Sequence, residues 1–208
     1  MSKFLILVVV LISVTVIALG TWFCFFREEG SQKVTKDGPI IFLGNSLTAG
    51  VGAGEGEDFP TLVADELNLK NVINAGVSGD TTTGGLARLK TDVLDKNPSL
   101  VIVELSGNDF LQQVPPNKTI ENLDSIVRQI HESGAAVLII NIKFPLREAE
   151  YEKGFKEIAK KYKAEVLWNA EDGIAGNSSL MADNIHPNAA GYKILASRVA
   201  KAIKPLLK

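Results

Sequence analysis

The chain has 208 residues, of which 46% are hydrophobic, and its formal net charge at pH 7 is -2. This length provides one globular domain with a sizeable core and a short additional segment. A near-neutral charge does not supply the positive surface that binds nucleic acid, so we expect no nucleic-acid partner. The only cysteine is Cys24, and the only histidines are His131 and His186. The sequence therefore excludes a disulfide and leaves little material for a metal centre, and we expect neither a metal nor another cofactor.

The amino-terminal segment is apolar. Residues 4–26 contain no charged side chain, and a helix of this length can cross a bilayer core that is about 30 Å thick. Lys3 precedes the apolar run and an aromatic cluster ends it, as in helices that stop at a membrane interface. We expect residues 1–27 to form a transmembrane anchor, residues 28–38 a linker, and residues 39–208 an extracytoplasmic domain, periplasmic or extracellular.

A cleaved signal peptide is the alternative for this segment. Residues 18–20 read Ala-Leu-Gly, which is an acceptable cleavage site after a shorter apolar region. Cleavage there would leave an apolar and aromatic new terminus, and bulky Trp22 and Phe23 before Cys24 argue against a lipoprotein site. Under either interpretation the domain lies outside the cytoplasm, anchored in the first case and secreted in the second.

From residue 39 onward, short apolar runs alternate with stretches of helical apolar spacing. The runs that we expect to form strands are residues 40–43, 71–77, 100–105, 136–142 and 164–168. The stretches that we expect to form helices are residues 59–67, 85–94, 119–133, 148–162 and 189–203. Strands that alternate with helices form a parallel sheet covered on both faces, so we predict one α/β domain with a five-stranded parallel sheet.

A glycine-rich stretch, residues 50–56, follows the first predicted strand. Its spacing departs from the dinucleotide pattern G-x-G-x-x-G, because Glu55 stands where the third glycine would be. A phosphate-binding G-x-x-x-x-G-K-[ST] motif does not occur in the chain either. We therefore expect a flexible loop here instead of a nucleotide site.

Small polar loops follow the first three predicted strands. They read Gly44-Asn45-Ser46, Ser78-Gly79-Asp80 and Ser106-Gly107-Asn108-Asp109. The carboxyl ends of parallel strands meet at one edge of a sheet, so these loops can converge. A further polar cluster, Asp183-Asn184-Ile185-His186-Pro187, precedes the last predicted helix.

Together these loops contain the groups that acyl transfer needs. Ser46 is the candidate nucleophile, His186 its general base, and Asp183 the carboxylate that orients the imidazole and stabilises its charged form. The candidate donors of an oxyanion hole are the backbone N–H groups of Ser46 and Gly79 and the side-chain amide of Asn108. Glycine at position 79 leaves room for a substrate to approach the backbone.

Several of the residues in these polar loops also have a purely structural explanation. The loop at residues 44–46 contains residue types that favour turns, and Asp183 and Pro187 could cap and begin the last helix. His131 fits an exposed histidine at a helix end, stabilised by the helix dipole. Ser78 and Ser106 are rival nucleophiles, which we interpret as loop formers because neither sits in a complete G-x-S-x-G elbow.

The four polar blocks resemble those of the SGNH (GDSL-type) hydrolases in order and spacing, over about residues 40–204. The runs Asn74 to Thr81 and Gly85 to Leu89 are similar to the bacterial thioesterase, lysophospholipase and arylesterase branch of that family. The resemblance implies a flavodoxin-like three-layer α/β/α sandwich. It also implies esterase, thioesterase or lysophospholipase activity without a metal or an organic cofactor.

The same resemblance implies the roles of the site residues. Ser46 corresponds to the nucleophile, His186 to its base and Asp183 to the partner of that base, while Gly79 and Asn108 complete the oxyanion hole. One residue departs from the family pattern, which usually has Asp where Asn45 stands. Asparagine keeps the turn-forming hydrogen bond and removes a negative charge beside the nucleophile. We expect activity to be retained, because Asn45 is not in the proton relay.

We therefore expect a serine hydrolase whose substrate is a small-molecule or lipid acyl ester or thioester. The alternatives are a carbohydrate O-acetyl esterase of the cell envelope and a non-catalytic binding module on the same fold.

Overall fold

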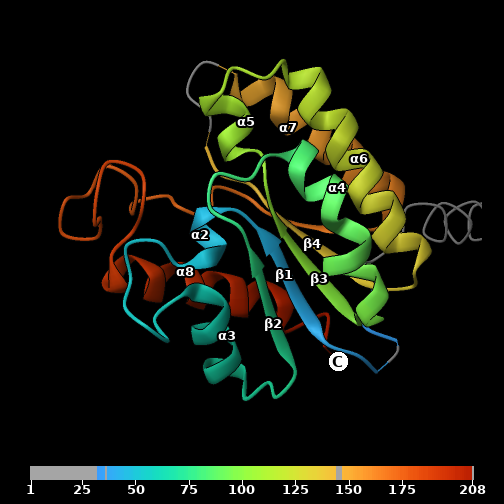
Figure 1. The fold of residues 1–208 in the computed structure, drawn as a ribbon, viewed down its shortest axis with the longest axis horizontal. Helices are drawn as coiled ribbons and strands as arrows, with labels where there is room; N and C mark the ends of the chain where they lie inside the picture. The colour runs from blue at the N-terminus through green and yellow to red at the C-terminus, as the bar shows by residue number, and fades with distance from the viewer. Residues whose placement is uncertain (1–31, 36, 144–146, 208) are drawn as a thin grey trace, which may run out of the picture. The chain divides into compact units, whose positions relative to one another are not determined.

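A computed structural model describes residues 32–35, 37–143 and 147–207. Five parallel strands form one sheet between two layers of helices (Figure 1). The strands are β1 (Ile40–Gly44), β2 (Val72–Gly76), β3 (Leu100–Glu104), β4 (Ala136–Ile140) and β5 (Glu165–Leu167), in the order β2-β1-β3-β4-β5. This architecture confirms the predicted α/β fold with a five-stranded parallel sheet.

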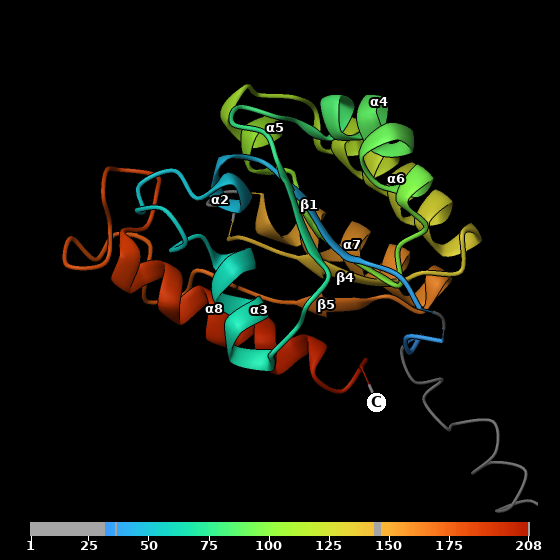
Figure 2. The same ribbon diagram turned by 60° about the horizontal axis from the view of Figure 1, so that its bottom comes forward.

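The helices lie on both faces of the sheet. They are α2 (Ser46–Ala49), α3 (Phe59–Leu67), α4 (Thr82–Asp92), α5 (Gly107–Leu111), α6 (Pro116–Glu132), α7 (Glu148–Tyr162) and α8 (Ala189–Ile203), with a 3-10 turn at Leu94–Lys96. Helices α3 and α8 cover one face, while α4, α6 and α7 cover the other (Figure 2).

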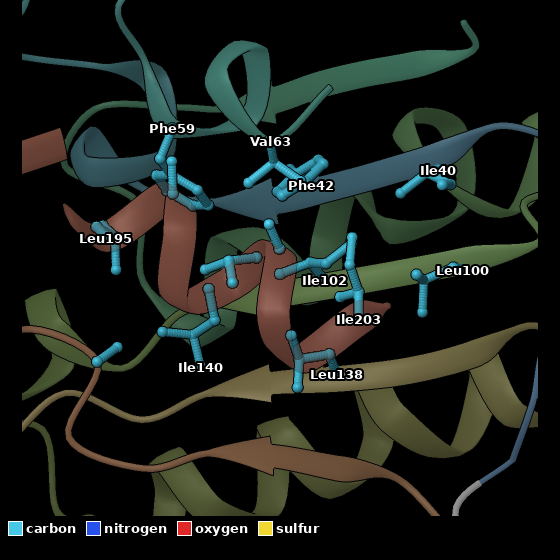
Figure 3. Packing of buried hydrophobic residues seen from close by; sticks show 14 of the residues in the cluster. Ile40, Phe42, Phe59, Val63, Leu100, Ile102, Leu138, Ile140, Leu195 and Ile203 are labelled. Carbon is cyan, nitrogen blue, oxygen red and sulfur yellow. The ribbon is translucent and has the colours of Figure 1, made fainter. Parts of the chain in front are cut away.

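Each face of the sheet carries its own hydrophobic core, because successive side chains of a strand point to opposite faces. On the side of α3 and α8, Phe42 and Ile102 pack against residues such as Phe59 (Figure 3). On the other side, Ile41 and Val103 pack against α4, α6 and α7. The central strands are therefore buried on both faces, which explains why their sequences are apolar without alternation.

Several element boundaries differ from the predicted ones. Helix α4 begins three residues before the predicted start, because the Thr81 side chain caps it by accepting a hydrogen bond from the N–H of Gly84. Helix α6 begins at Pro116, a residue type suited to a first turn. Two one-turn helices, α2 and α5, stand where we expected loops.

The expected anchor or signal segment, residues 1–27, lies outside the described residues. Within the described part of the chain, no helix is long and apolar enough to cross a membrane. The described part of the expected linker contacts the domain, since the N–H groups of Gln32 and Val34 donate to the carbonyls of Lys163 and Leu206 at 2.8 and 2.9 Å. The expectation that His131 is exposed is wrong: it is half-buried, with Nδ1 2.8 Å from Gln32 Oε1.

Truncation of a central core residue should destabilise the domain. Ile102→Ala removes a fully buried side chain, and we expect the free energy of unfolding to fall by about 2–5 kcal/mol in urea titrations. The matched control is Ile194→Ala on α8, where the side chain is 37% exposed and the expected change is within about 0.5 kcal/mol. Equal effects of the two substitutions would contradict this description of the core.

Candidate active site

The predicted nucleophile, Ser46, is the first residue of α2, and one residue, Asn45, separates it from the end of β1. The Asn45 side chain caps this helix, because its Oδ1 accepts a hydrogen bond from the N–H of Leu47 at 3.0 Å. Ser46 is 8% exposed, so its position is set by surrounding atoms and not by a free loop.

Two glycines let α2 lie directly on the strand ends. A Cβ on Gly76 would lie 2.3 Å from the backbone nitrogen of Ala49, and one on Gly44 would lie 1.9 Å from Thr48 Oγ1. Any other residue at these positions would push α2, and with it Ser46, away from the sheet.

A continuous hydrogen-bonded chain joins the three predicted residues Ser46, His186 and Asp183. His186 Nε2 lies 2.9 Å from Ser46 Oγ, and His186 Nδ1 lies 2.8 Å from Asp183 Oδ2. With Nδ1 facing a carboxylate, the neutral ring carries its proton there and Nε2 is left to accept the serine hydroxyl proton. These residues are 140 positions apart at the longest link and meet only through the fold.

The turn that carries His186 is stabilised by Asp183. One carboxylate oxygen, Oδ1, accepts hydrogen bonds from the backbone N–H groups of Ile185 and His186, both at 2.7 Å. The hydrogen bond from the His186 side chain, together with these backbone donors, lowers the pKa of Asp183 to about 2. Asp183 is therefore ionised at neutral pH.

The structural alternative for this turn is excluded. Helix α8 begins at Ala189, and its cap is Asn188, whose Oδ1 accepts hydrogen bonds from the N–H groups of Ala190 and Gly191. Neither Asp183 nor Pro187 therefore caps or begins α8.

The predicted oxyanion-hole residues lie at the same edge of the sheet. Asn108 is in the first turn of α5, and its Nδ2 donates to the backbone carbonyl of Asp80 at 2.8 Å, next to Gly79. Gly79 has φ of +80°, a conformation that favours glycine. Among the described residues, the N–H groups of Ser46 and Gly79 have no hydrogen-bond acceptor and remain able to bind a ligand.

The rival serines are placed differently. Ser106 is fully buried, and its Oγ has no hydrogen-bond partner among the described residues. Ser78 is exposed, and neither serine is hydrogen-bonded to a histidine in the described part of the chain. Of these three serines, Ser46 alone is paired with a histidine in the described part of the chain.

A cavity of about 210 Å³ opens beside Ser46. Its wall combines Ser46 and Asn108 with apolar side chains, among them Leu47, Phe110, Ile142 and Ile185. A polar reacting end and an apolar wall suit a ligand that is itself polar at one end and apolar at the other.

Two carboxyl groups near the site were not predicted from the sequence. Glu104, the last residue of β3, is buried and accepts hydrogen bonds from Asn45 N, Asn45 Nδ2 and Thr48 Oγ1 at 3.3, 3.0 and 3.0 Å. Burial raises its pKa to about 8, although the three donors favour the ionised form. A single charged residue inside the apolar run 100–105 is the signal that could have identified it.

The second carboxyl group belongs to Glu171 in the cavity wall. Burial raises its pKa to about 7, and the nearby His186 opposes this shift. Its Oε1 is buried without a hydrogen-bond partner among the described residues. No sequence motif contains this residue.

Within the described residues, no group of three or more His, Cys, Asp or Glu side chains could hold a metal ion.

Comparison with known proteins gives consistent results. A model of the GDSL-like lipase/acylhydrolase family matches residues 42–194. Esterase TesA of Pseudomonas aeruginosa is 32% identical over 178 residues, which cover 81% of this chain and 89% of that protein. Thioesterase 1/protease 1/lysophospholipase L1 of Escherichia coli is 32% identical over 175 residues, which cover 81% of this chain and 84% of that protein.

A solved structure extends the similarity to three dimensions. The psychrotrophic esterase EstA from Pseudoalteromonas sp., in a crystal structure inhibited by monoethylphosphonate, is 28% identical and has a TM-score of 0.74. The match covers 81% of this chain and 98% of that one. Since the family model spans most of the chain and the relatives align over nearly their full lengths, this chain belongs to the GDSL-like lipase/acylhydrolase family, the SGNH hydrolases.

Proposed function

We propose that this protein is a serine hydrolase that cleaves carboxylic ester or thioester bonds of acyl substrates. The observation that carries the proposal is the hydrogen-bonded chain from Ser46 Oγ through the His186 ring to the Asp183 carboxylate, at 2.9 and 2.8 Å. These distances lie within the range over which a base can remove the proton of a nucleophile.

The first half of the reaction acylates Ser46. Its Oγ attacks the acyl carbon while its proton passes to His186 Nε2, and the negative charge of Asp183 stabilises the resulting imidazolium. The carbonyl oxygen becomes an oxyanion, for which the N–H groups of Ser46 and Gly79 and the amide of Asn108 are the donors. When this intermediate collapses, the bond to the leaving group breaks and His186 returns the proton to the departing alkoxide or thiolate.

The second half releases the acid. Water attacks the acyl-serine ester, His186 Nε2 takes a proton from that water, and the same donors bind the second oxyanion. Collapse breaks the bond to Ser46 Oγ, which takes the proton back, and the carboxylic acid leaves. The three residues Ser46, His186 and Asp183 are thereby restored without a metal or an organic cofactor.

An acyl group with an apolar chain is the substrate class that the site favours. The cavity beside Ser46 is lined by apolar side chains, and relatives at 32% identity carry the names esterase, thioesterase and lysophospholipase. A carbohydrate O-acetyl esterase would use the same apparatus on a much smaller acyl group. Comparison of p-nitrophenyl acetate with medium-chain esters distinguishes them, since an apolar acyl site gives higher kcat/KM for the longer chain.

We also propose that the domain works outside the cytoplasm, attached through residues 1–27 or released after their cleavage. The apolar sequence of residues 4–26 supports this location. Fractionation of cells that express the full chain, with mass determination of the mature amino terminus, separates the anchored form from the secreted one.

Removal of the nucleophile should abolish turnover. We expect Ser46→Ala to lower kcat for p-nitrophenyl esters by at least about 10³-fold and to abolish labelling by a fluorophosphonate, while urea unfolding stays close to wild type. The matched control, Ser78→Ala, lies in a neighbouring loop and should keep activity and labelling. Comparable hydrolysis by Ser46→Ala and wild type would refute the hydrolase and favour the non-catalytic binding module.

Removal of the Asp183 charge should lower the rate of hydrolysis. In Asp183→Asn the imidazolium loses its carboxylate partner, so we expect kcat for p-nitrophenyl esters to fall by about 10²- to 10⁴-fold. Asp172→Asn, at an exposed position of the preceding loop, is the control for a charge change alone. An unchanged kcat in Asp183→Asn would show that Asp183 does not act through the histidine.

Asn45 and Glu104 form a buried hydrogen-bonded pair beside the nucleophile, and this pair leads to a prediction about stability. The pKa of Glu104 is raised from 4.5 to about 8 in the folded state, so above about pH 4.5 the folded state holds a proton that the unfolded state releases. The free energy of unfolding therefore falls as the pH rises from about 4.5 to about 8. Asn45→Asp places a second carboxyl group 3.0 Å from Glu104 Oε1. Two carboxylates that close raise the pKa of the pair further, so the loss of stability should extend to higher pH.

Urea unfolding at about pH 6 and about pH 9 measures this effect. We expect the free energy of unfolding of Asn45→Asp to fall more between the two pH values than that of wild type. Asn177→Asp is the control, because Asn177 is exposed and, among the described residues, its side-chain Oδ1 accepts hydrogen bonds from Ser179, a role that a carboxylate keeps. Parallel pH dependence in Asn45→Asp and wild type would mean that position 45 does not interact with Glu104 as described.

A further inference from the structure

We propose that Arg88 is a positioning residue for the oxyanion hole, through contacts that hold the loop of Ser46 and the loop of Gly79 in fixed relation to each other. This inference rests on the proposed function, because it assigns a role relative to the same three donors. Arg88 lies on α4, touches none of the reacting groups and belongs to none of the four polar blocks.

One guanidinium group joins several separate segments. Arg88 Nη2 donates to the carbonyl of Gly44, the last residue of β1, at 3.0 Å, and Nη1 donates to the carbonyl of Ala75 in β2 at 2.8 Å. Nε donates to Asp80 Oδ2 at 2.7 Å, and Nη1 also donates to Asp92 Oδ2 at 3.0 Å. The Arg88 side chain is only 16% exposed, so water competes weakly for these contacts.

The positions of these acceptors relate the guanidinium to the donors of the oxyanion hole. Gly44 lies two residues before Ser46, and Asp80 directly follows Gly79. The carbonyl of Asp80 in turn accepts the hydrogen bond from Asn108 Nδ2 at 2.8 Å. Each of the three donors is thus close to a residue that Arg88 contacts: the N–H groups of Ser46 and Gly79 lie within two peptide units of Gly44 and Asp80, and Asn108 is one hydrogen bond from Asp80.

The Asp80 carboxylate is held in a fixed position at the start of α4. A Cβ on Gly84 would lie 1.8 Å from Asp80 Oδ1, so this carboxylate lies against the first turn of α4 at a place where only glycine leaves room. Asp80 Oδ1 also accepts the N–H of Thr81 at 3.0 Å. The carboxylate is therefore fixed on one side by the helix start and on the other by Arg88.

Lysine could not replace this arrangement. A guanidinium is planar and presents its N–H groups in a rigid fork, whereas an ammonium is a point charge on a flexible chain. Backbone carbonyls at two strand ends and a carboxylate in a third segment need donors that diverge in one plane. Arg88→Lys should keep the charge opposite Asp80 and lose the simultaneous contacts to Gly44 and Ala75.

Displaced donors should affect the transition state more than substrate binding. An oxyanion exists only during the chemical steps, so donors that are moved by a fraction of an ångström lower kcat while KM changes little. We expect kcat per active site of Arg88→Lys to fall by about 10- to 100-fold. A boronic acid that forms a tetrahedral adduct with Ser46 should bind more weakly by a similar factor.

The experiment measures kcat and KM for a p-nitrophenyl ester, with the concentration of active sites determined by fluorophosphonate titration. The titration separates positioning from stability, because a merely structural role reduces the number of active sites and leaves kcat per site unchanged. The matched control is Arg128→Lys on α6, where an exposed arginine pairs with Glu132 at 3.3 Å and the expected effect is negligible. If Arg88→Lys does not fold, Asp80→Asn takes its place in the experiment. This variant keeps the shape of Asp80 and removes its charge, and it should lower kcat per active site by part of the expected factor.

Coupling to Asn108 provides a second test. Asn108→Ala removes one of the donors that Arg88 positions, so the Arg88→Lys effect should be smaller in the Asn108→Ala background than in wild type. Fully additive effects, or an unchanged kcat per site in both Arg88→Lys and Asp80→Asn, would overturn the proposal.

A failure of the proposed function gives a different result. If wild type neither hydrolyses esters nor reacts with the fluorophosphonate, the hydrolase is refuted and the role of Arg88 in an oxyanion hole is refuted with it. If wild type does both, the variants alone decide the role of Arg88. Chemical shifts of the Asn108 side-chain amide, measured by NMR, should move in Arg88→Lys and not in Arg128→Lys; identical shifts in both would also overturn the proposal.

Discussion

The whole site depends on the register of three parallel strands. Gly44 at the end of β1 is paired with Gly76 on one side and with Glu104 on the other, so β1, β2 and β3 all end at the same level. The order β2-β1-β3 also means that the chain connections reverse direction on the two sides of β1. Open α/β sheets bind ligands at such a point, and the loops with Ser46, Gly79 and Asn108 leave the sheet there.

Glu104 at the end of β3 is connected to the segment that carries Ser46, because it is a buried hydrogen-bond acceptor for Asn45 and Thr48. Asn45 suits this place because its amide donates to Glu104 while its carbonyl oxygen caps α2. A residue that departs from the usual family pattern thus has a complete set of hydrogen-bond partners in this chain.

Much of the fold follows from local sequence patterns. Helices α3, α7 and α8 have the predicted bounds, because each combines regular apolar spacing with clear stop or start signals. Helices α2 and α5 were not predicted, since a single turn is not stable alone and forms here only because tertiary contacts hold it.

The residues of the site also fall into two groups, those that the sequence predicted and those that it did not. Ser46, Gly79, Asn108, Asp183 and His186 could be selected from the sequence because they stand next to strand ends or to the start of the last helix. Their distances could not be predicted, because each depends on the strand register. Glu104 and Glu171 belong to no motif, and Arg88 belongs to none of the four polar blocks. The partners of Glu104 lie 56 and 59 positions away, and the carbonyl of Gly44 that Arg88 contacts lies 44 positions away. Glu171 lines a cavity that only the folded chain forms. The half-buried His131 was missed for the same reason, because Gln32 is 99 positions from it.

Gly44 and Gly76, which lie under α2, connect the stability of the helix that carries Ser46 to the stability of the sheet. The Ala49 backbone lies directly against Gly76, and Asn74 Nδ2 in β2 donates a hydrogen bond to the carbonyl of Thr48 in α2 at 2.8 Å, so contacts of α2 are lost when the end of β2 opens. Amide protons of α2 should therefore exchange with solvent at a free energy close to that of β1. Residues 183–185 are exposed, so we expect the turn that carries His186 to open at a lower free energy than α2.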